Sequence, residues 1–280
     1  MLSYAIIDMM KKTIAPLVKK VFHTSKFTLE LLDKGITNYN YLLTINEDRY
    51  IVRIPKIQGI FDRVYENEVL QRIIPLDIDI TPFYFDIDTG IKITPFIKDL
   101  HEFTSYRHHS KIEKTANILR KLHEANIQTG KRFNPLGKLE LYQNNIVNKR
   151  YPYQEFKSIQ TIVENYKCSE VLCHNDLVAG NICFNSNRTY LIDYEYAGDN
   201  DPLFDVMSFI TENELTNKQE DDFLLYYFKN QPSNETRRAL DMWRDFHNLL
   251  WLSWSNMMYD QTHEEIFLII AEQKYQALKK

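Results

Sequence analysis

Apolar and polar residues alternate in the first third of the chain, which predicts β-strands there. Two runs rich in β-branched and aromatic residues, 39–45 and 49–55, are divided by the polar residues 46–48, a pattern typical of a hairpin. Alternation puts Val52 and Arg53 of the second run on opposite faces of its strand. We therefore expect an antiparallel hairpin with one apolar face.

One helix and a second hairpin follow this first pair of strands. Apolar residues recur at helical spacing over 58–73, and Pro75 ends the predicted helix. Residues 83–88 and 91–96 are again β-rich and flank a turn that contains glycine. The order of strands, helix and strands predicts a small mixed lobe.

From residue 98 onward the pattern is mostly helical, and only one short β-region, 171–193, interrupts it. The segments with helical periodicity are 111–125, 153–166, 218–230, 235–259 and 263–279. We therefore predict an α+β, two-lobed fold. Residues 1–97 would form a small N-terminal lobe with an antiparallel β-sheet and one main helix. Residues 98–280 would form a larger, mostly helical C-terminal lobe.

The composition is that of a folded globular protein. Of the 280 residues, 44% are hydrophobic and 26% are charged, so disorder is not expected. The net charge of −4 offers no basic surface for nucleic acid. No apolar run reaches the roughly 18 residues of a membrane span. Segment 1–20 carries its lysines after its apolar residues, which predicts an amphipathic helix and not a secretory signal. The three cysteines lack the paired short spacings of a metal site; they are Cys168, Cys173 and Cys183. An odd, low number of cysteines is typical of proteins in a reducing cytoplasm.

Three polar residues near apolar strands carry the candidate chemistry. Asp176 is followed five residues later by Asn181 and, after a further twelve, by Asp193 at the end of an apolar run. Phosphoryl transfer needs a carboxylate near the acceptor hydroxyl and oxygen ligands for Mg²⁺, because negative charge spreads over the phosphoryl oxygens. The alternative is a turn at Asn175 and a solvated loop after Asp193. The joint pattern favours a kinase.

The motifs around these residues resemble a known family. His174-x-Asp176-x-x-x-x-Asn181 is followed by the runs 192–198 and 201–205. Together they resemble the choline/ethanolamine kinases, most closely the bacterial Lic-type choline kinases, within the aminoglycoside-phosphotransferase-like and protein-kinase-like superfamily. The resemblance covers nearly the whole chain. It implies a protein-kinase-like fold and ATP- and Mg²⁺-dependent phosphorylation of a small alcohol.

The resemblance also implies a role for each matched residue. Asp176 would be the catalytic acid/base, and Asn181 and Asp193 would be Mg²⁺ ligands. Glu195 would stand near the metal or the substrate cation. The residues implied as supports of the catalytic loop are His174 and Asp205.

The nucleotide is expected to bind in the N-terminal lobe. The kinase scaffold pairs a strand cation on the α- and β-phosphates with a helix glutamate, and Arg53 and Glu68 are the candidates. Arginine stays charged and offers a planar fork of donors, although a surface arginine on an edge strand is the alternative. By resemblance or analogy, the other nucleotide-binding residues are Thr37 and Asn38 in the loop before a strand, and Phe96 and Ile97 near the adenine.

The acceptor is expected in the C-terminal lobe. Trp251 and Trp254 lie three residues apart, on one face of a predicted helix. Indole faces attract quaternary ammonium groups, which cannot donate an N–H hydrogen bond. The candidate carboxylates are Glu195, Glu212 and, at the reacting end, Asp176. The alternative is that the indoles only pack the helical core.

These patterns predict a cytoplasmic ATP:choline phosphotransferase that requires Mg²⁺, with ATP and choline as its partners and with no nucleic acid or membrane span. The sequence does not specify an oligomeric state. A sibling kinase for ethanolamine, thiamine or an aminoglycoside is the first alternative. A nucleotide-binding pseudokinase is the second, and the intact set of phosphoryl-transfer residues argues against it.

Overall fold

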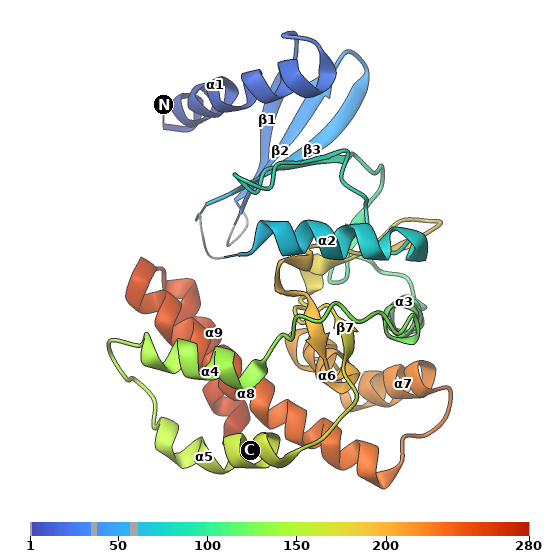
Figure 1. Ribbon diagram of the computed structural model, residues 1–280, viewed down its shortest axis with the longest axis vertical. Coiled ribbons are helices and arrows are strands. Elements are labelled where there is room, and N and C mark those ends of the chain that lie inside the picture. The colour runs from blue at the N-terminus through green and yellow to red at the C-terminus, as the bar shows by residue number, and fades with distance from the viewer. Residues whose placement is uncertain (1, 35–37, 57–60, 280) are drawn as a thin grey trace. The chain divides into compact units, whose positions relative to one another are not determined.

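The computed structural model describes residues 2–34, 38–56 and 61–279 (Figure 1). The chain forms two compact units. The first unit comprises Met1–Leu100 together with Asn185–Glu195, and the second comprises His101–Phe184 together with Tyr196–Lys280. The first division lies close to the sequence-based boundary at residue 97, whereas the grouping of 185–195 with the first unit was not predicted.

The first unit is built on a five-stranded antiparallel sheet in the order β1-β2-β3-β5-β4. Its strands are β1 (Thr28–Lys34), β2 (Asn38–Ile45), β3 (Asp48–Pro55), β4 (Tyr84–Phe85) and β5 (Lys92–Pro95). Alternation along the strands places Tyr41, Val52 and Ile93 in register and in the core, where each is 0% exposed. Burial of such side chains stabilises the sheet by about 25 cal/mol per Å² of apolar surface.

Two helices accompany this sheet within the first unit. The amphipathic α1 (Leu2–Phe22) packs against it through the buried residues Ile14 and Val18 (Figure 1). The second helix, α2 (Arg63–Ile73), begins at Asp62, whose side chain accepts a hydrogen bond from the Tyr65 N–H at 3.0 Å. The sequence placed the start of α2 at residue 58, and residues 57–60 lie outside the described residues.

The second unit is mainly helical, as predicted. Its helices are α3 (Lys111–Glu124), α4 (Pro135–Asn144), α5 (Lys157–Asn165), α6 (Pro202–Glu212), α7 (Asn217–Phe228), α8 (Asn234–Thr262) and α9 (Glu265–Leu278). The long helix α8 packs against α4, α5, α6 and α9 (Figure 1). This arrangement explains why α8 carries apolar residues on nearly all sides in its middle.

Short strands position the loops that matter for function. In the second unit, β7 (Val171–Cys173) pairs with β10 (Gly198–Asn200), and β6 (His101–Glu102) pairs with β8 (Ile182–Phe184). In the first unit, Leu191 of β9 (Thr189–Leu191) donates its N–H to the Ile78 carbonyl at 2.8 Å. The 3₁₀ turns are Ile74–Leu76, Tyr153–Phe156, Ala179–Asn181 and Tyr194–Tyr196. Among the helices that the structure describes, none combines the length and the hydropathy needed to cross a membrane.

Candidate active site

The loop that carries Asp176 leaves β7 and is held by the first turn of α6. Asp205, which is fully buried, accepts the backbone N–H groups of His174 and Asn175, both at 2.7 Å. A carboxylate that accepts backbone N–H groups in a buried setting forms strong, charge-assisted hydrogen bonds. These bonds fix the backbone immediately before Asp176. Asp205, which the family resemblance implied as a support of this loop, thus contacts the loop backbone, and His174 takes part through its own backbone N–H.

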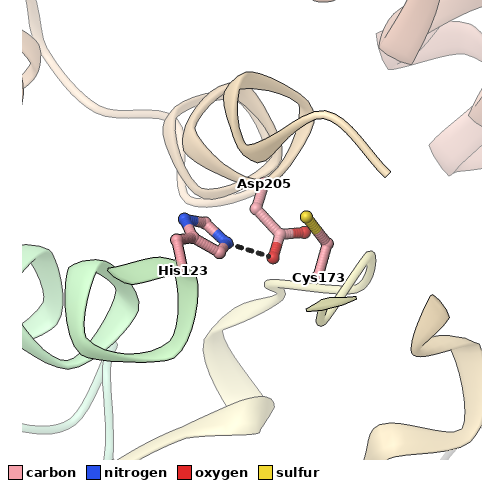
Figure 2. Close-up of side chains that lie close together, drawn as sticks. All are labelled: His123, Cys173 and Asp205. Atoms are coloured by element: carbon pink, nitrogen blue, oxygen red, sulfur yellow. Dashed lines mark hydrogen bonds and ion pairs between the residues drawn. The ribbon is translucent and has the colours of Figure 1, made fainter. Parts of the chain in front are cut away.

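The same aspartate belongs to a buried cluster with His123 and Cys173 (Figure 2). The three side chains offer ligand atoms within 4.8 Å of one another, which is the proximity a metal site needs. Each offered atom already has a protein partner, however. His123 lies 3.1 Å from Asp205 through Nε2 and 2.7 Å from the Tyr227 hydroxyl through Nδ1. The Cys173 thiol donates to the Asn200 carbonyl at 3.4 Å, and burial raises its pKa. We interpret the cluster as a structural anchor of the loop.

Asn175 ties the start of the loop to the neighbouring strand. Its backbone is in the left-handed region at φ 64°, which asparagine tolerates better than most residues. Its side-chain amide donates to the carbonyls of Tyr196 and Gly198, both at 3.2 Å. Its carbonyl oxygen accepts the Asn200 amide at 2.8 Å. Sequence reasoning missed this role, although an asparagine that lies outside a strand and precedes the candidate catalytic aspartate was the available signal.

Asp176 and Asn181 lie next to each other in the second unit. The Asn181 amide nitrogen donates to the Asp176 carboxylate at 2.9 Å and to its backbone carbonyl at 2.8 Å. The short turn Ala179–Asn181 brings the two side chains together across five positions of sequence. Because the amide nitrogen is engaged with Asp176, the Asn181 side-chain oxygen is the atom suited to a metal ion.

Tyr142 of α4 lies in the electrostatic field of Asp176. Burial raises the pKa of the Tyr142 hydroxyl, and the Asp176 charge raises it further. The phenol is therefore a neutral hydrogen-bond donor at physiological pH. The sequence gave no signal for Tyr142, because α4 was not predicted.

Asp193 lies in the first unit, where it ion-pairs with Arg53 of β3. Its backbone is left-handed at φ 75°. Arg53 also lies 3.7 Å from the Glu195 carboxylate, whose side chain is only 3% exposed. Burial and the Asp193 charge raise the pKa of Glu195 to about 7. The predicted strand cation thus lies beside two predicted metal-site carboxylates.

The helix glutamate that turns toward the sheet is Glu66 and not the predicted Glu68. Glu68 pairs with Arg72 at 2.6 Å one helical turn away, and both side chains are more than 40% exposed. Glu66 is 1% exposed and ion-pairs with Lys92 of β5. It precedes the buried Val69, Leu70 and Ile73 by three, four and seven positions and so shares their face. The expected pairing of Arg53 with Glu68 is therefore corrected.

Arg63 links Glu66 of α2 to Glu195. Its guanidinium lies 2.7 Å from Glu66 and 3.3 Å from Glu195. Lys92 stands opposite Arg53 in the register of β3 and β5. The sequence did not single out Arg63 or Lys92, because charged side chains in amphipathic segments are usually solvated.

Three of the remaining nucleotide candidates, Asn38, Phe96 and Ile97, lie at or just beyond the ends of strands in the first unit. Asn38 is buried at the start of β2, whereas Thr37 lies outside the described residues. Phe96 follows β5, donates its N–H to the Arg49 carbonyl at 3.1 Å, and stacks 4.0 Å from the Arg49 guanidinium. Ile97 is half-buried beside it.

The two predicted indoles form an aromatic cluster in the second unit. Trp251 and Trp254 meet edge to face with centroids 5.6 Å apart, and Tyr196 meets Trp251 in the same way at 6.0 Å. Trp254 also packs against Phe267 of α9 at 5.4 Å. Trp251 is 7% exposed and Trp254 is half-buried. Edge-to-face packing of this kind is the arrangement that aromatic pairs prefer, and a cation binds to the faces of such rings.

Glu212, the predicted acceptor carboxylate, is already paired with cationic and polar partners. It ion-pairs with Lys274 of α9 and lies 3.2 Å from His247 Nδ1. Burial raises the pKa of Glu212, but Lys274 and His247 outweigh it and lower the value to about 2. Burial lowers the pKa of His247. Sequence reasoning did not single out His247 or Lys274.

Residues 28–243 match the phosphotransferase enzyme family. The chain belongs to this family. Protein LicA of Haemophilus influenzae is 27% identical over 252 residues, which cover 83% of this chain and 74% of that protein. The crystal structure of choline kinase LicA from Streptococcus pneumoniae superposes with a TM-score of 0.81 at 25% identity, covering 97% of this chain and 99% of the other. LicA in complex with AMP gives a TM-score of 0.77 at 24% identity, covering 96% and 98%.

The similarity to choline kinases confirms the family resemblance and the fold class that the sequence predicted. Enzymes of this family transfer phosphoryl groups, which is the reaction that the spacing of Asp176, Asn181 and Asp193 predicted. The carboxylate of Asp193 in the first unit and the amide oxygen of Asn181 in the second are each hard ligands of the kind that Mg²⁺ prefers.

Proposed function

We propose that this phosphotransferase transfers the terminal phosphoryl group of ATP to the hydroxyl of choline and requires Mg²⁺. The aromatic cluster of Trp251, Trp254 and Tyr196 is the observation that carries the choice of acceptor. A trimethylammonium group binds best to aromatic faces, because it has no N–H to donate. The names of the LicA relatives support the same acceptor.

Asp176 orients the choline hydroxyl and accepts its proton as the phosphoryl group is transferred. The hydrogen bond from Asn181 holds the Asp176 carboxylate in place for this task. Asn181 and Asp193, with Glu195 nearby, would hold Mg²⁺, which neutralises charge on the phosphate oxygens. Asp205 keeps the backbone before Asp176 in one conformation and so positions the base indirectly.

Arg53 binds the α- and β-phosphates of the nucleotide. Its planar guanidinium matches the geometry of phosphate oxygens and stays charged under all conditions. Burial alone would lower the pKa of Arg53, but the carboxylates of Asp193 and Glu195 outweigh it, so the pKa lies above its ordinary value. Asn38, Phe96 and Ile97, at strand ends in the same unit, are the proposed neighbours of the nucleotide. In this proposal Glu66 replaces Glu68 as the helix acid.

A kinase for ethanolamine, thiamine or an aminoglycoside is the main alternative within the family. A primary ammonium needs hydrogen-bond acceptors, and a polycationic sugar needs several acids. Glu212, the acid that the sequence nominated for the acceptor, is separated from Trp251 by His247, and Lys274 already balances its charge. A cytoplasmic location agrees with the three free thiols.

The proposal is tested by measuring ADP release with Mg²⁺ and ATP on four acceptors: choline, ethanolamine, thiamine and an aminoglycoside. We expect choline to give the highest kcat/KM. A higher kcat/KM with another acceptor would identify a sibling kinase. Tight ATP binding without ADP release on any acceptor would identify a pseudokinase.

A further inference from the structure

A chain of polar contacts connects helix α9 to the aromatic cluster. Lys274 of α9 ion-pairs with Glu212 at the end of α6, and Glu212 lies 3.2 Å from Nδ1 of His247 on α8. His247 Nε2 lies 2.9 Å from the indole nitrogen of Trp251. The carboxylate is therefore one imidazole ring away from the proposed cation cage. The side chains of Lys274, Glu212 and His247 are only 10%, 16% and 0% exposed.

The donors and acceptors in this chain are determined by their chemistry. An indole N–H can only donate, so His247 Nε2 is the acceptor of the Trp251 bond. The proton of a neutral imidazole is then on Nδ1, which lies 3.1 Å from the Thr211 hydroxyl and 3.2 Å from Glu212. One Glu212 oxygen, Oε1, thus accepts the Lys274 ammonium and also lies within ion-pairing distance of His247 Nδ1.

This arrangement matters for the acceptor because primary and quaternary ammonium groups need different partners. Ethanolamine carries an ammonium with three N–H donors, and a carboxylate is its best partner. Choline carries no such donor and gains little from a carboxylate oxygen at hydrogen-bonding distance. A carboxylate whose charge is already balanced by a buried lysine is a poor partner for either substrate.

We propose that Lys274 is a specificity-determining residue that withholds Glu212 from the acceptor and thereby favours choline over ethanolamine. The inference rests on the proposed function, because it concerns the choice between acceptors of that same reaction. Lys274 acts by preventing a contact and does not itself bind the substrate. Without it, Glu212 would be available to accept N–H groups from a primary ammonium.

The test compares kcat/KM for choline, its dimethyl and monomethyl analogues, and ethanolamine, in the unmodified protein and in Lys274→Met. We expect the unmodified protein to lose activity with each methyl group removed. Lys274→Met should raise the ethanolamine-to-choline ratio of kcat/KM by about tenfold or more, the gain from one hydrogen bond to a charged group. Lys274→Arg, which keeps the charge, should leave the ratio near that of the unmodified protein.

Two further variants separate the role of Lys274 from a general disturbance. The double variant Glu212→Gln with Lys274→Met should lose the gain, because no free carboxylate remains. It also replaces a buried ion pair by neutral groups, which proteins commonly tolerate. Lys279→Met removes an exposed lysine just beyond the same helix and should not change the ratio.

The outcomes distinguish this inference from the proposed function. An unmodified protein inactive on all four acceptors would overturn the proposed function. Normal choline turnover with an unchanged ratio in Lys274→Met, or an equal gain in the double variant, would overturn the role of Lys274 alone. If Lys274→Met does not fold, Glu212→Gln decides: a ratio that falls by about tenfold would show a direct carboxylate–ammonium contact, against the proposal.

Discussion

At the residue scale, Asp176 is the side chain on which turnover should depend most. Asn181 and the Asp205-anchored backbone both restrict its position. Replacing it by asparagine keeps the size and removes the acceptor for the hydroxyl proton. We expect Asp176→Asn to lower kcat by roughly 10²–10⁴-fold, the usual contribution of a general base. Nucleotide affinity, measured by titration, should be unchanged. Turnover like that of the unmodified protein would contradict the mechanism.

The Trp251 indole should determine choline affinity. A desolvated cation–π contact contributes about 2 kcal/mol, so Trp251→Ala should raise the choline KM by roughly 30-fold. Trp251→Phe keeps an aromatic face but loses the hydrogen bond to His247, and its effect should be smaller. The matched control is Trp243→Phe on the same helix, where the indole donates to Asp201 instead. An equal rise in KM in the control would show that the effect is not specific to the cage.

Single residues differ in how far their sequence context could identify them. Asp176, Asn181 and Asp193 could be singled out as candidates because their residue types and spacing fit one reaction. The sequence could have favoured Glu66 over Glu68, because the apolar residues Val69 and Leu70 follow Glu66 by three and four positions and so lie on its face of the helix. Lys274 could not be identified from the sequence, because a lysine near the end of an amphipathic helix is usually exposed. Its burial depends on its ion pair with Glu212, which is 62 positions away.

At the scale of elements, the first turn of α6 supports the catalytic loop, and its loss should cost stability. Asp205→Asn removes the charge that accepts two backbone N–H groups and leaves buried donors poorly satisfied. We expect a loss of about 3 kcal/mol in the free energy of unfolding, measured with urea. The exposed Asp221→Asn on α7 should change it by less than about 0.5 kcal/mol. Equal effects would contradict the anchor.

Glu212 of α6, which lies beside His247 of α8 and Lys274 of α9, should make the free energy of unfolding depend on pH in the acid range. The pKa of Glu212 is about 2 in the folded protein and 4.5 in its ordinary state, so the unfolded chain binds more protons between these values. Stability from this group is therefore present above pH 4.5 and is lost as the pH falls toward 2. The loss is at most about 3 kcal/mol. Glu212→Gln should remove this part of the pH dependence in urea unfolding at several pH values, whereas an unchanged profile would contradict it.

Most elements followed from hydrophobic periodicity, and the exceptions have physical causes. The strands predicted at 39–45 and 49–55 are β2 and β3, and the helix predicted at 235–259 is α8. Helices α4 and α6 lie outside the segments that periodicity predicted. Of the two, α4 is short and contains Gly137, and its apolar residues do not form a clear stripe. Its start depends on Asn134, whose side chain accepts the Gly137 N–H at 3.1 Å.

At the scale of the whole molecule, the chain divides into two units that each have their own core. The return of Asn185–Glu195 to the first unit could not be predicted, because it depends on contacts between residues far apart in sequence, such as Arg53 and Asp193. This return places Asp193 and Glu195 beside Arg53, Arg63 and their partners. The first unit thus carries the residues proposed for the phosphates, and the second carries Asp176 and the aromatic cluster.

Because ligands that bind only the folded state raise its stability, ATP with Mg²⁺ should raise the melting temperature of the full chain. At a concentration one hundred times Kd the gain is about 2.7 kcal/mol, or roughly 5–10 °C for a protein of this size. Removing Mg²⁺ with EDTA should abolish most of the shift. Arg53→Gln should weaken it through lost phosphate contacts, while the exposed Arg72→Gln should retain it. An equal rise in melting temperature with and without EDTA would mean that Asn181 and Asp193 do not hold a metal needed for nucleotide binding.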